Sequence, residues 1–335
     1  MGGFAELLNP YNLQIVTTIL VNCLLALSVW IPLTAGQLSL GGAGFMSVGA
    51  YTAAILSLQS GWPAPLAIAA GAVASSIVAY ALGYPVLRLH GVYLAIATLG
   101  FGELVRIAAL NLRITNGALG LAGIPQIADD TAFWLEDRGI VPYGETLAGL
   151  DSFTWGSLLI LGLLTLILAA VVYALWRRRN SRVGRALRAI QLDEMAAQAM
   201  GIDIARFKLR VFTESGFLAG LAGGLYAHLS YYIGPGDFGF NRAIEMLVYV
   251  VLGGEGTLLG PLLGAGIVTA LPEVLRASPS HRAILYGLIL LLIVLFAPGG
   301  LLSRETLGRI ARIFGRKGDK GKEIEPTDER GLPHA

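Results

Sequence analysis

The sequence predicts an all-α, polytopic helical membrane protein, and composition is the first reason. Apolar residue types make up 55% of the 335 residues and charged types only 14%, whereas charged residues reach about 25% in an average globular domain. Mean hydropathy is +0.68. A water-soluble protein of this length could not cover so much apolar surface with so few charges. Lipid is therefore expected to surround most of the chain.

Segments of membrane-spanning length are the second reason. A hydrocarbon layer about 30 Å thick is crossed by about 20 apolar residues in a helix. Residues 158–175 are apolar on every face, which excludes the alternating pattern of a membrane β-barrel. We expect about nine spans, within a range of eight to ten and with a possible internal repeat. The predicted bounds are 14–34, 38–58, 64–87, 93–110, 156–176, 210–229, 243–258, 261–276 and 283–298.

The distribution of charge is the third reason, and it predicts the orientation. Nine of the 24 Lys and Arg residues lie in 177–210 and eight lie in 304–330, so the positive-inside rule places both segments in the cytoplasm. The segment 111–152 carries six acidic residues against two arginines and is expected to face outward. Nine spans put the N-terminus outside, and ten would put it inside. The predicted organisation is a transmembrane domain at 1–302, with a cytoplasmic loop at 177–209, and a largely disordered cytoplasmic tail at 303–335.

One of two glycine patterns is a stripe within a predicted span. Gly216, Gly220 and Gly224 recur at every fourth position and leave a smooth helix face. Lipid provides no hydrophobic drive for helix association, so close approach at small residues supplies the packing. We interpret the stripe as a helix contact, within the chain or to a partner, with a pathway-lining stripe as the alternative.

The other glycine pattern is a short repeat. LGGAGFMSVGA at 40–50 and LGGEGTLLGPL at 252–262 share a leucine and three glycines in register. Transporters built from repeats carry broken helices whose ends can meet a polar solute. We therefore expect a solute pathway near these glycines, with simple bends between short helices as the alternative. The candidates are Gly41, Gly42, Gly44, Gly253, Gly254 and Gly256.

A few charged residues stand inside apolar segments. Glu103 and Arg106 are three residues apart and so share one helix face. An unpaired charge at the bilayer centre costs about 2.5–3.5 kcal/mol, so we predict an intramembrane ion pair, either structural or part of a gate. Glu245 lies near a predicted span end, where water reaches it. His228 flanks a predicted outer loop and is expected to be solvated.

The sequence contains no recognisable catalytic, metal-binding or nucleotide-binding pattern. GxxxxGK followed by Ser or Thr, HExxH and GxSxG are all missing. The four histidines lack metal-ligand spacing, and Cys23 is the single cysteine. A net charge of +2 gives a nucleic-acid partner no support. We predict that the chain is not an enzyme and binds no metal or cofactor.

The second part of the basic loop predicts a short, capped helix. Asp193 can cap a helix of about seven residues that runs to Met200, and Gly201 can close it in the left-handed conformation. A short helix of this kind, with small side chains on its surface, could bind in a groove of another protein. Its small apolar surface would consist of Met195, Ala196, Ala199 and Met200.

Six segments between residues 30 and 300 carry a family resemblance when taken together. They are 36–51, 91–107, 115–121, 193–203, 217–227 and 251–265, in this order. As a set they resemble the membrane subunits of branched-chain amino-acid ABC importers, specifically the LivM type of the LivH/LivM permease family. The match covers most of residues 30–300.

The resemblance implies an importer in the bacterial plasma (inner) membrane for branched-chain, hydrophobic amino acids. Its expected partners are a second, related permease, two cytoplasmic ATPases that hold ATP and Mg²⁺, an extracytoplasmic solute-binding protein and the lipid bilayer. The short helix of the basic loop would couple to the ATPase, although the loop reads Glu-Met-Ala-Ala rather than a literal Glu-Ala-Ala. The implied coupling residues are Asp193, Glu194, Ala196, Ala197 and Gly201.

Other transport functions stay open at the level of sequence. Within the ABC class, the solute could be urea or a short-chain amide. An ion-coupled secondary transporter would normally need carboxylates deep in several spans, and Glu103 is the one clear candidate. A channel is a third possibility, although no ring-forming charge pattern is visible.

Overall fold

The computed structural model describes residues 10–138, 151–277, 282–296 and 299–302. This part of the chain is all-α, as predicted, apart from the two-residue strands β1 (Leu121–Ala122) and β2 (Tyr232–Ile233). The helices are α2 (Pro10–Leu33), α3 (Gly42–Ser60), α4 (Ala64–Val86), α5 (Val92–Asn111), α6 (Ile127–Asp137), α7 (Ser152–Arg179), α8 (Arg182–Leu192), α9 (Glu194–Ala199), α10 (Ile204–Leu229), α11 (Phe240–Gly253), α12 (Gly260–Val274) and α13 (Arg282–Phe296). Short 3₁₀ turns are η1 (Gly117–Leu119), η2 (Pro235–Phe238) and η3 (Leu275–Ala277). The predicted tail at 303–335 lies outside the described residues.

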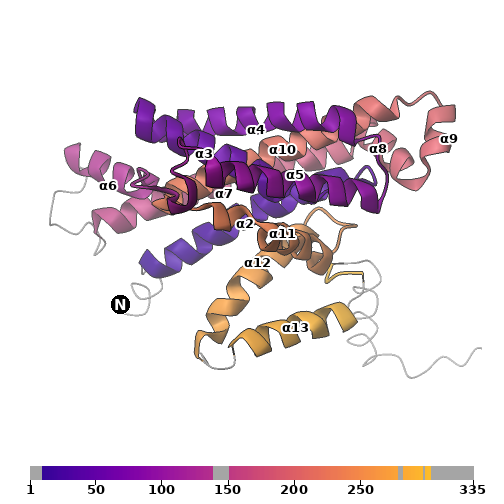
Figure 1. Cartoon of the computed structure of the whole chain (residues 1–335). Coiled ribbons are helices and arrows are strands. Elements are labelled where there is room, and N and C mark those ends of the chain that lie inside the picture. The colour runs from indigo at the N-terminus through magenta and orange to yellow at the C-terminus, as the bar shows by residue number, and fades with distance from the viewer. Residues whose placement is uncertain (1–9, 139–150, 278–281, 297–298, 303–335) are drawn as a thin grey trace, which may run out of the picture.

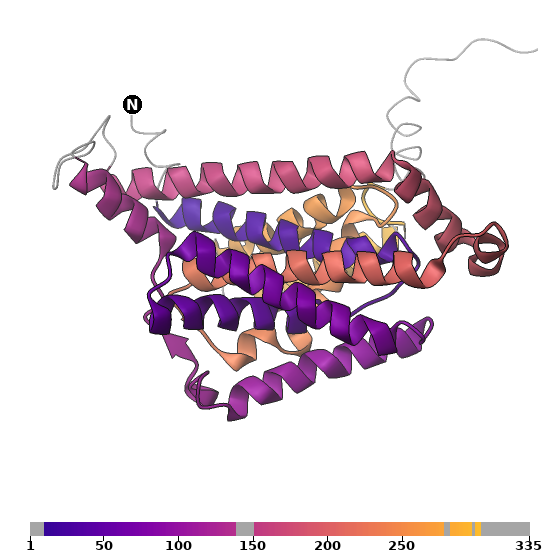
Figure 2. The ribbon, with the colours of Figure 1, turned by 90° about the horizontal axis from the view of Figure 1, so that it is seen from above.

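The acidic and basic segments lie at opposite ends of the helical bundle. The start of α2 and α6 lie at one end, and α8 and α9 extend from the other (Figure 1, Figure 2). At the α8 end, Gln191 Nε2 donates a hydrogen bond of 3.2 Å to the carbonyl of Leu33, the last residue of α2. At the opposite end, β1 pairs with β2 through Leu121 and Ile233. The arrangement agrees with a cytoplasmic α8–α9 end and an external α6 end.

Each of the nine predicted spans corresponds to a helix, but the number of membrane crossings stays a prediction. Among the described residues, four helices (α2, α4, α5 and α7) are long and apolar enough to cross a membrane by length and composition. Helices α11, α12 and α13 have only 14 or 15 residues, which at 1.5 Å per residue is shorter than the hydrocarbon layer of about 30 Å.

Two predicted spans extend four or five residues beyond their helices, and backbone geometry explains both. The span predicted at 38–58 begins only at Gly42, because Gly36 adopts φ +70° and the chain turns before the helix starts. The span predicted at 243–258 ends at Gly253, because Gly254 adopts φ +103°, which no helix tolerates. The predicted outer loop also contains the unpredicted helix α6, which packs against α7.

Helix α2 occupies the centre of the fold. The most apolar stretch of α2 is 72% buried, whereas that of α7 is only 22% buried. Residues Leu24–Leu27 are almost inaccessible, and α2 packs against α10, α12 and α7. Helix α7 therefore lies at the periphery, although it is the longest apolar helix among those described.

The glycine stripe of α10 packs against α4. A Cβ atom on Gly216 would lie 2.3 Å from the Ala79 Cβ, and one on Gly220 would lie 2.4 Å from the Ser75 Cβ. The Ser75 hydroxyl lies 2.8 Å from the Gly216 carbonyl oxygen and hydrogen-bonds to it. Gly224 lies against Ile68. The stripe is thus a contact between helices of one chain.

Candidate functional site

Helix α8 forms the first part of the basic loop and packs on the end of the bundle where α2 ends. The Ser181 hydroxyl caps it by accepting a hydrogen bond of 3.4 Å from the Gly184 amide. Leu187 and Ile190 are buried, whereas the arginines on the other face are exposed or partly exposed. The helix is therefore amphipathic and packed, with its apolar face against the protein.

Helix α9 follows as a separate turn of helix that is closed at both ends. The Asp193 carboxylate accepts hydrogen bonds from the amides of Met195 (2.9 Å) and Ala196 (3.1 Å). At the other end, the Gly201 amide donates to the Gln198 carbonyl (2.9 Å), and Gly201 adopts φ +81°. Ile202 donates to Ala197 (3.1 Å), which completes a Schellman motif. The predicted cap and left-handed glycine are confirmed, with the helix ending at Ala199 rather than at Met200.

Glu194 links α9 to α10 and to the α4–α5 loop. Its carboxylate lies 2.5 Å from Lys208 Nζ on α10 and 3.7 Å from His90 Nε2 in the α4–α5 loop. The Lys208 side chain is only 6% exposed. Sequence reasoning missed Lys208, because its pairing depends on how α9 folds back onto α10. Glu194 thus holds the position of α9.

The exposed tip around α9 carries three large apolar side chains. Leu192, Met195 and Met200 are 87%, 81% and 84% exposed, and we call these three residues the methionine patch. Ala196 is exposed as well, whereas Ala197 is 3% exposed and faces the protein. Of the predicted coupling residues, Asp193, Glu194, Ala197 and Gly201 therefore build and anchor the helix. The methionine patch supplies most of the surface that another protein could bury.

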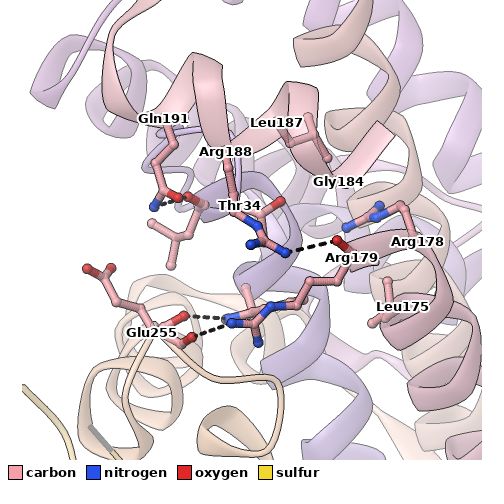
Figure 3. Close-up of a pocket in the computed structure, with 12 residues that line it drawn as sticks. Thr34, Leu175, Arg178, Arg179, Gly184, Leu187, Arg188, Gln191 and Glu255 are labelled. Atoms are coloured by element: carbon pink, nitrogen blue, oxygen red, sulfur yellow. Dashed lines mark hydrogen bonds between the residues drawn. The ribbon is translucent and has the colours of Figure 1, made fainter. Parts of the chain in front are cut away.

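Contacts from α8 and the end of α7 tie this region to the membrane helices. Arg179 donates to the Gly256 carbonyl (3.0 Å), and Arg188 donates to the Arg179 carbonyl (3.0 Å). Arg178 pairs with Glu214 on α10. The three arginines and Gly256 line a cavity of about 250 Å³ between α2, α7, α8 and the α11–α12 loop (Figure 3). A displacement of α8 would therefore act on several helices at once.

The predicted pathway glycines are not brought together. Gly42 faces Met246, and a Cβ on Gly44 would lie 2.8 Å from the Gly102 Cα. A Cβ on Gly253 would lie 1.8 Å from the Gly260 carbonyl oxygen, so this glycine permits α11 to touch α12. Gly254 supplies the turn that follows, and Gly256 borders the cavity beside α8. Gly41 precedes α3.

The two copies of the glycine repeat adopt different structures. Residues 40–50 enter and begin α3, whereas residues 252–262 contain the end of α11, a turn and the start of α12. The sequence similarity therefore does not extend to local structure. A pathway role for the six glycines stays a prediction.

Charged residues of α5 and α11 form two separate groups. Glu103 and Arg106 on α5 contact each other, with Arg106 Nε 2.9 Å from Glu103 Oε1. Sequence reasoning missed a second group, in which Arg242 donates to Glu245 (2.8 Å) and to Asn22 on α2 (2.7 Å). The Arg242–Glu245 spacing of three residues is the signal that would have found this pair. Glu245 is thus held in a network, and its side chain is 37% exposed.

A metal-ligand cluster would be one kind of functional site among the described residues. Within the ranges that the structure covers, no three His, Cys, Asp or Glu side chains gather so that they could hold a metal ion. The candidate features on the described residues are the capped, exposed helix α9 and the charged groups of α5 and α11.

Loss of the Asp193 cap is expected to loosen α9 without unfolding the protein. Asp193→Ala removes the acceptor for two amides, and loss of such a cap costs about 1 kcal/mol. Amide hydrogen exchange in residues 194–200 should therefore accelerate by about fivefold in the detergent-solubilised chain. Asp203→Ala, which removes the cap from the long helix α10 (Arg206 amide, 3.1 Å), should leave that segment unchanged. Unchanged exchange in Asp193→Ala would mean that the contact with α10 alone maintains α9.

Comparison with known proteins agrees with this geometry. The family model described as "Branched-chain amino acid transport system / permease component" matches residues 11–297. The LivM permease protein of the high-affinity branched-chain amino acid transport system of Salmonella typhimurium is 35% identical over 278 residues, which cover 80% of this chain and 64% of that protein. The LivM protein of Escherichia coli K12 is 34% identical over 274 residues, with the same coverage.

The related permease LivH gives a weaker match. LivH of Escherichia coli K12 is 24% identical over 260 residues, which cover 76% of this chain and 80% of that protein. The match spans 64% of the length of the LivM relatives, and no solved structure matches the chain. A family model that matches most of the chain nevertheless decides its membership. The protein belongs to the family of permease components of branched-chain amino acid transport systems.

Proposed function

We propose that this chain is the membrane-spanning permease subunit of an ABC importer for branched-chain, hydrophobic amino acids. It would form the translocation pathway together with a related permease in the bacterial inner membrane. Two cytoplasmic ATPases would bind ATP and Mg²⁺ and drive the cycle, and an extracytoplasmic binding protein would deliver the solute. This chain itself would bind no cofactor and catalyse no reaction. Family membership supports the transport role, and the printed names of the LivM relatives support the solute class.

The observation that carries the ATPase part of the proposal is the construction of α9. A single exposed apolar side chain is common on protein surfaces, but here three large ones lie within nine residues of sequence: Leu192 ends α8, Met195 is in α9 and Met200 follows α9. Helix α9 between them is capped at both ends and anchored through Glu194. A rigid, exposed apolar patch marks a protein interaction site. Because it lies at the basic, cytoplasmic end, its partner is a cytoplasmic protein.

A rigid-body mechanism follows from the contacts around α8. Closure of the ATPases would displace α9, and Glu194 would transmit this displacement to α10 through Lys208. The hydrogen bond from Gln191 to Leu33 and that from Arg179 to Gly256 would transmit it to α2 and to the α11–α12 loop. Packed helices respond to such a displacement by shifting between discrete arrangements, as alternating access requires.

Copurification and transport by the same preparation test this function. The tagged chain, coexpressed with the ATPases, second permease and binding protein of its organism, is expected to bring down the ATPases from detergent extracts. Proteoliposomes that contain this complex should accumulate radiolabelled leucine only when ATP and the binding protein are present. Excess isoleucine should reduce this leucine uptake, whereas excess urea or acetamide should not. Uptake by the purified chain alone, driven by an ion gradient, would show a secondary transporter instead. Competition by urea would reassign the solute.

A further inference from the structure

A cavity of about 190 Å³ lies against the middle of α5, at the beginnings of two other helices. Leu40 and Ala43 contribute from the start of α3, and Phe240 and Ala243 contribute from the start of α11. Helix α3 runs away from the cytoplasmic end, whereas α11 runs toward it (Figure 1). Two helix N-termini therefore border one cavity from opposite sides.

Both of these helix starts lack a side-chain cap. The N-cap residues are Gly41 for α3 and Gly239 for α11, and neither can supply a side-chain acceptor. The first-turn amides of a helix have no partner within the helix, and they carry the positive end of the helix dipole. A carboxylate placed between the two helix starts would meet favourable charge from both.

The α5 side of the cavity carries the Glu103–Arg106 ion pair. Glu103 lines the cavity, and the Arg106 side chain lies against Gly239, with Arg106 Cδ 3.4 Å from the position of a Cβ on that glycine. The side chains of Glu103 and Arg106 are 41% and 28% exposed. Charged groups this exposed near the middle of a membrane-spanning helix face water or a polar partner, because hydrocarbon would penalise them.

The remainder of the lining is apolar. Leu99 from α5 and Phe238 from η2 line the cavity together with Leu40 and Phe240. Phe240 is 55% exposed, so the apolar part also lies near the surface of the chain. The cavity thus combines a carboxylate, a guanidinium, two helix N-termini and an apolar wall within a small volume.

We propose that this cavity is a transit site for a zwitterionic amino acid with an aliphatic side chain, an inference that rests on the proposed transport function. The solute ammonium would bind Glu103. The solute carboxylate would lie between the helix starts and Arg106. The side chain would pack against Leu99 and Phe240. The ion pair would part to receive the solute and close again behind it, which keeps binding weak enough for passage.

Reversal of the ion pair distinguishes this site from a structural role. Glu103→Arg combined with Arg106→Glu preserves an ion pair at the same spacing but places the carboxylate beside the start of α11. If the pair is structural, the reversed variant should transport leucine at a normal rate, although each single substitution fails. The transit site predicts that uptake by the reversed complex stays about tenfold or more below wild type, because each charged hydrogen bond to the solute is misplaced. Normal uptake by the reversed variant would overturn the proposal.

A matched control exists at the outer end of the chain. Glu273 and Arg276 form an ion pair with the same spacing (3.2 Å) away from the cavity, and reversal of this pair should leave uptake unchanged. Every variant is measured as the complete complex, with ATPase copurification and ATP hydrolysis as separate readouts. Loss of ATPase copurification from the wild-type chain would refute the proposed function, whereas normal assembly with normal uptake by the reversed variant refutes only the transit site.

Labelling of the cavity provides a second test that does not depend on the ion pair. In a Cys23→Ala background, Phe240→Cys should react with a charged methanethiosulfonate reagent in the assembled complex. Excess leucine should slow this reaction about threefold or more, whereas isoamylamine, which lacks the carboxylate, should not. Leu104→Cys, at an exposed α5 position outside the cavity lining, should be unaffected by either compound. Equal rates at Phe240→Cys with and without leucine would overturn the proposal.

Discussion

Gly220→Leu is expected to prevent the chain from folding, which is the largest stability effect among the substitutions considered. A Cβ at this position would lie 2.4 Å from the Ser75 Cβ and 3.1 Å from the Gly71 carbonyl oxygen on α4. On its other side, the Gly220 backbone packs on α3, where its carbonyl oxygen is 2.2 Å from the position of a Cβ on Gly49. Helix α10 therefore has no direction in which to move. Overpacking by single methylenes already costs about 1–3 kcal/mol, and leucine adds a whole side chain.

The measurement is the yield of monodisperse protein in detergent, together with its melting temperature. Gly162→Leu is the matched control, because this α7 glycine is exposed and nothing lies within 4 Å of a Cβ placed on it. The control should behave as wild type, whereas Gly220→Leu should yield aggregate. Equal yields of folded protein from both variants would contradict the close packing of α3, α4 and α10.

Helices that lie in lipid were the most predictable part of the fold. The spans predicted at 64–87 and 93–110 agree within two residues with α4 (Ala64–Val86) and α5 (Val92–Asn111). This agreement has a simple cause: in hydrocarbon, every backbone group must be bonded within its own helix, so apolar length alone indicates a helix. Helix α6 escaped prediction because it lies outside the apolar segments, where this constraint does not apply.

Local capping signals were equally informative at the candidate site. Asp193 and Gly201 act through their own neighbours in sequence, so their roles in α9 could be predicted. Which face of α9 is buried could not be predicted from the sequence. Ala197 is buried and Met195 is exposed because Glu194 reaches Lys208 on another helix, and that pairing is a property of the tertiary fold.

Polar partners from distant parts of the sequence were beyond prediction for the same reason. His228, expected to be solvated, is fully buried, and its Nε2 lies 2.8 Å from the Ser57 hydroxyl on α3. The Arg242–Asn22 contact likewise joins residues 220 positions apart. The four-residue spacing of the α10 glycines was visible in the sequence, but the sequence did not show that α4 packs against them. Composition therefore predicts which groups need partners, and only packing identifies those partners.

Met195→Asp combined with Met200→Asp is expected to uncouple the chain from its ATPase, with the largest effect on function. Both side chains are more than 80% exposed, so the fold itself loses almost nothing. Burial of two carboxylates at an apolar interface should instead weaken ATPase binding by about 4 kcal/mol, since interface hot spots contribute about 2 kcal/mol each. This corresponds to a loss of about a thousandfold in affinity. Copurified ATPase and ATP-dependent leucine uptake should both fall to background.

Two further variants separate docking from folding in this experiment. Leu119→Asp introduces a single carboxylate at a residue that is 76% exposed at the opposite, outer end, and it should retain the ATPase. Ala197→Asp places a charge on the buried face of α9 and should accelerate amide exchange there, which the methionine-patch variant should not do. A methionine-patch variant that binds the ATPase with wild-type affinity would place the docking contact elsewhere. If Leu119→Asp also failed to copurify with the ATPase, the loss of ATPase binding in both variants would be explained by defective membrane insertion, because the two sites lie at opposite ends of the bundle.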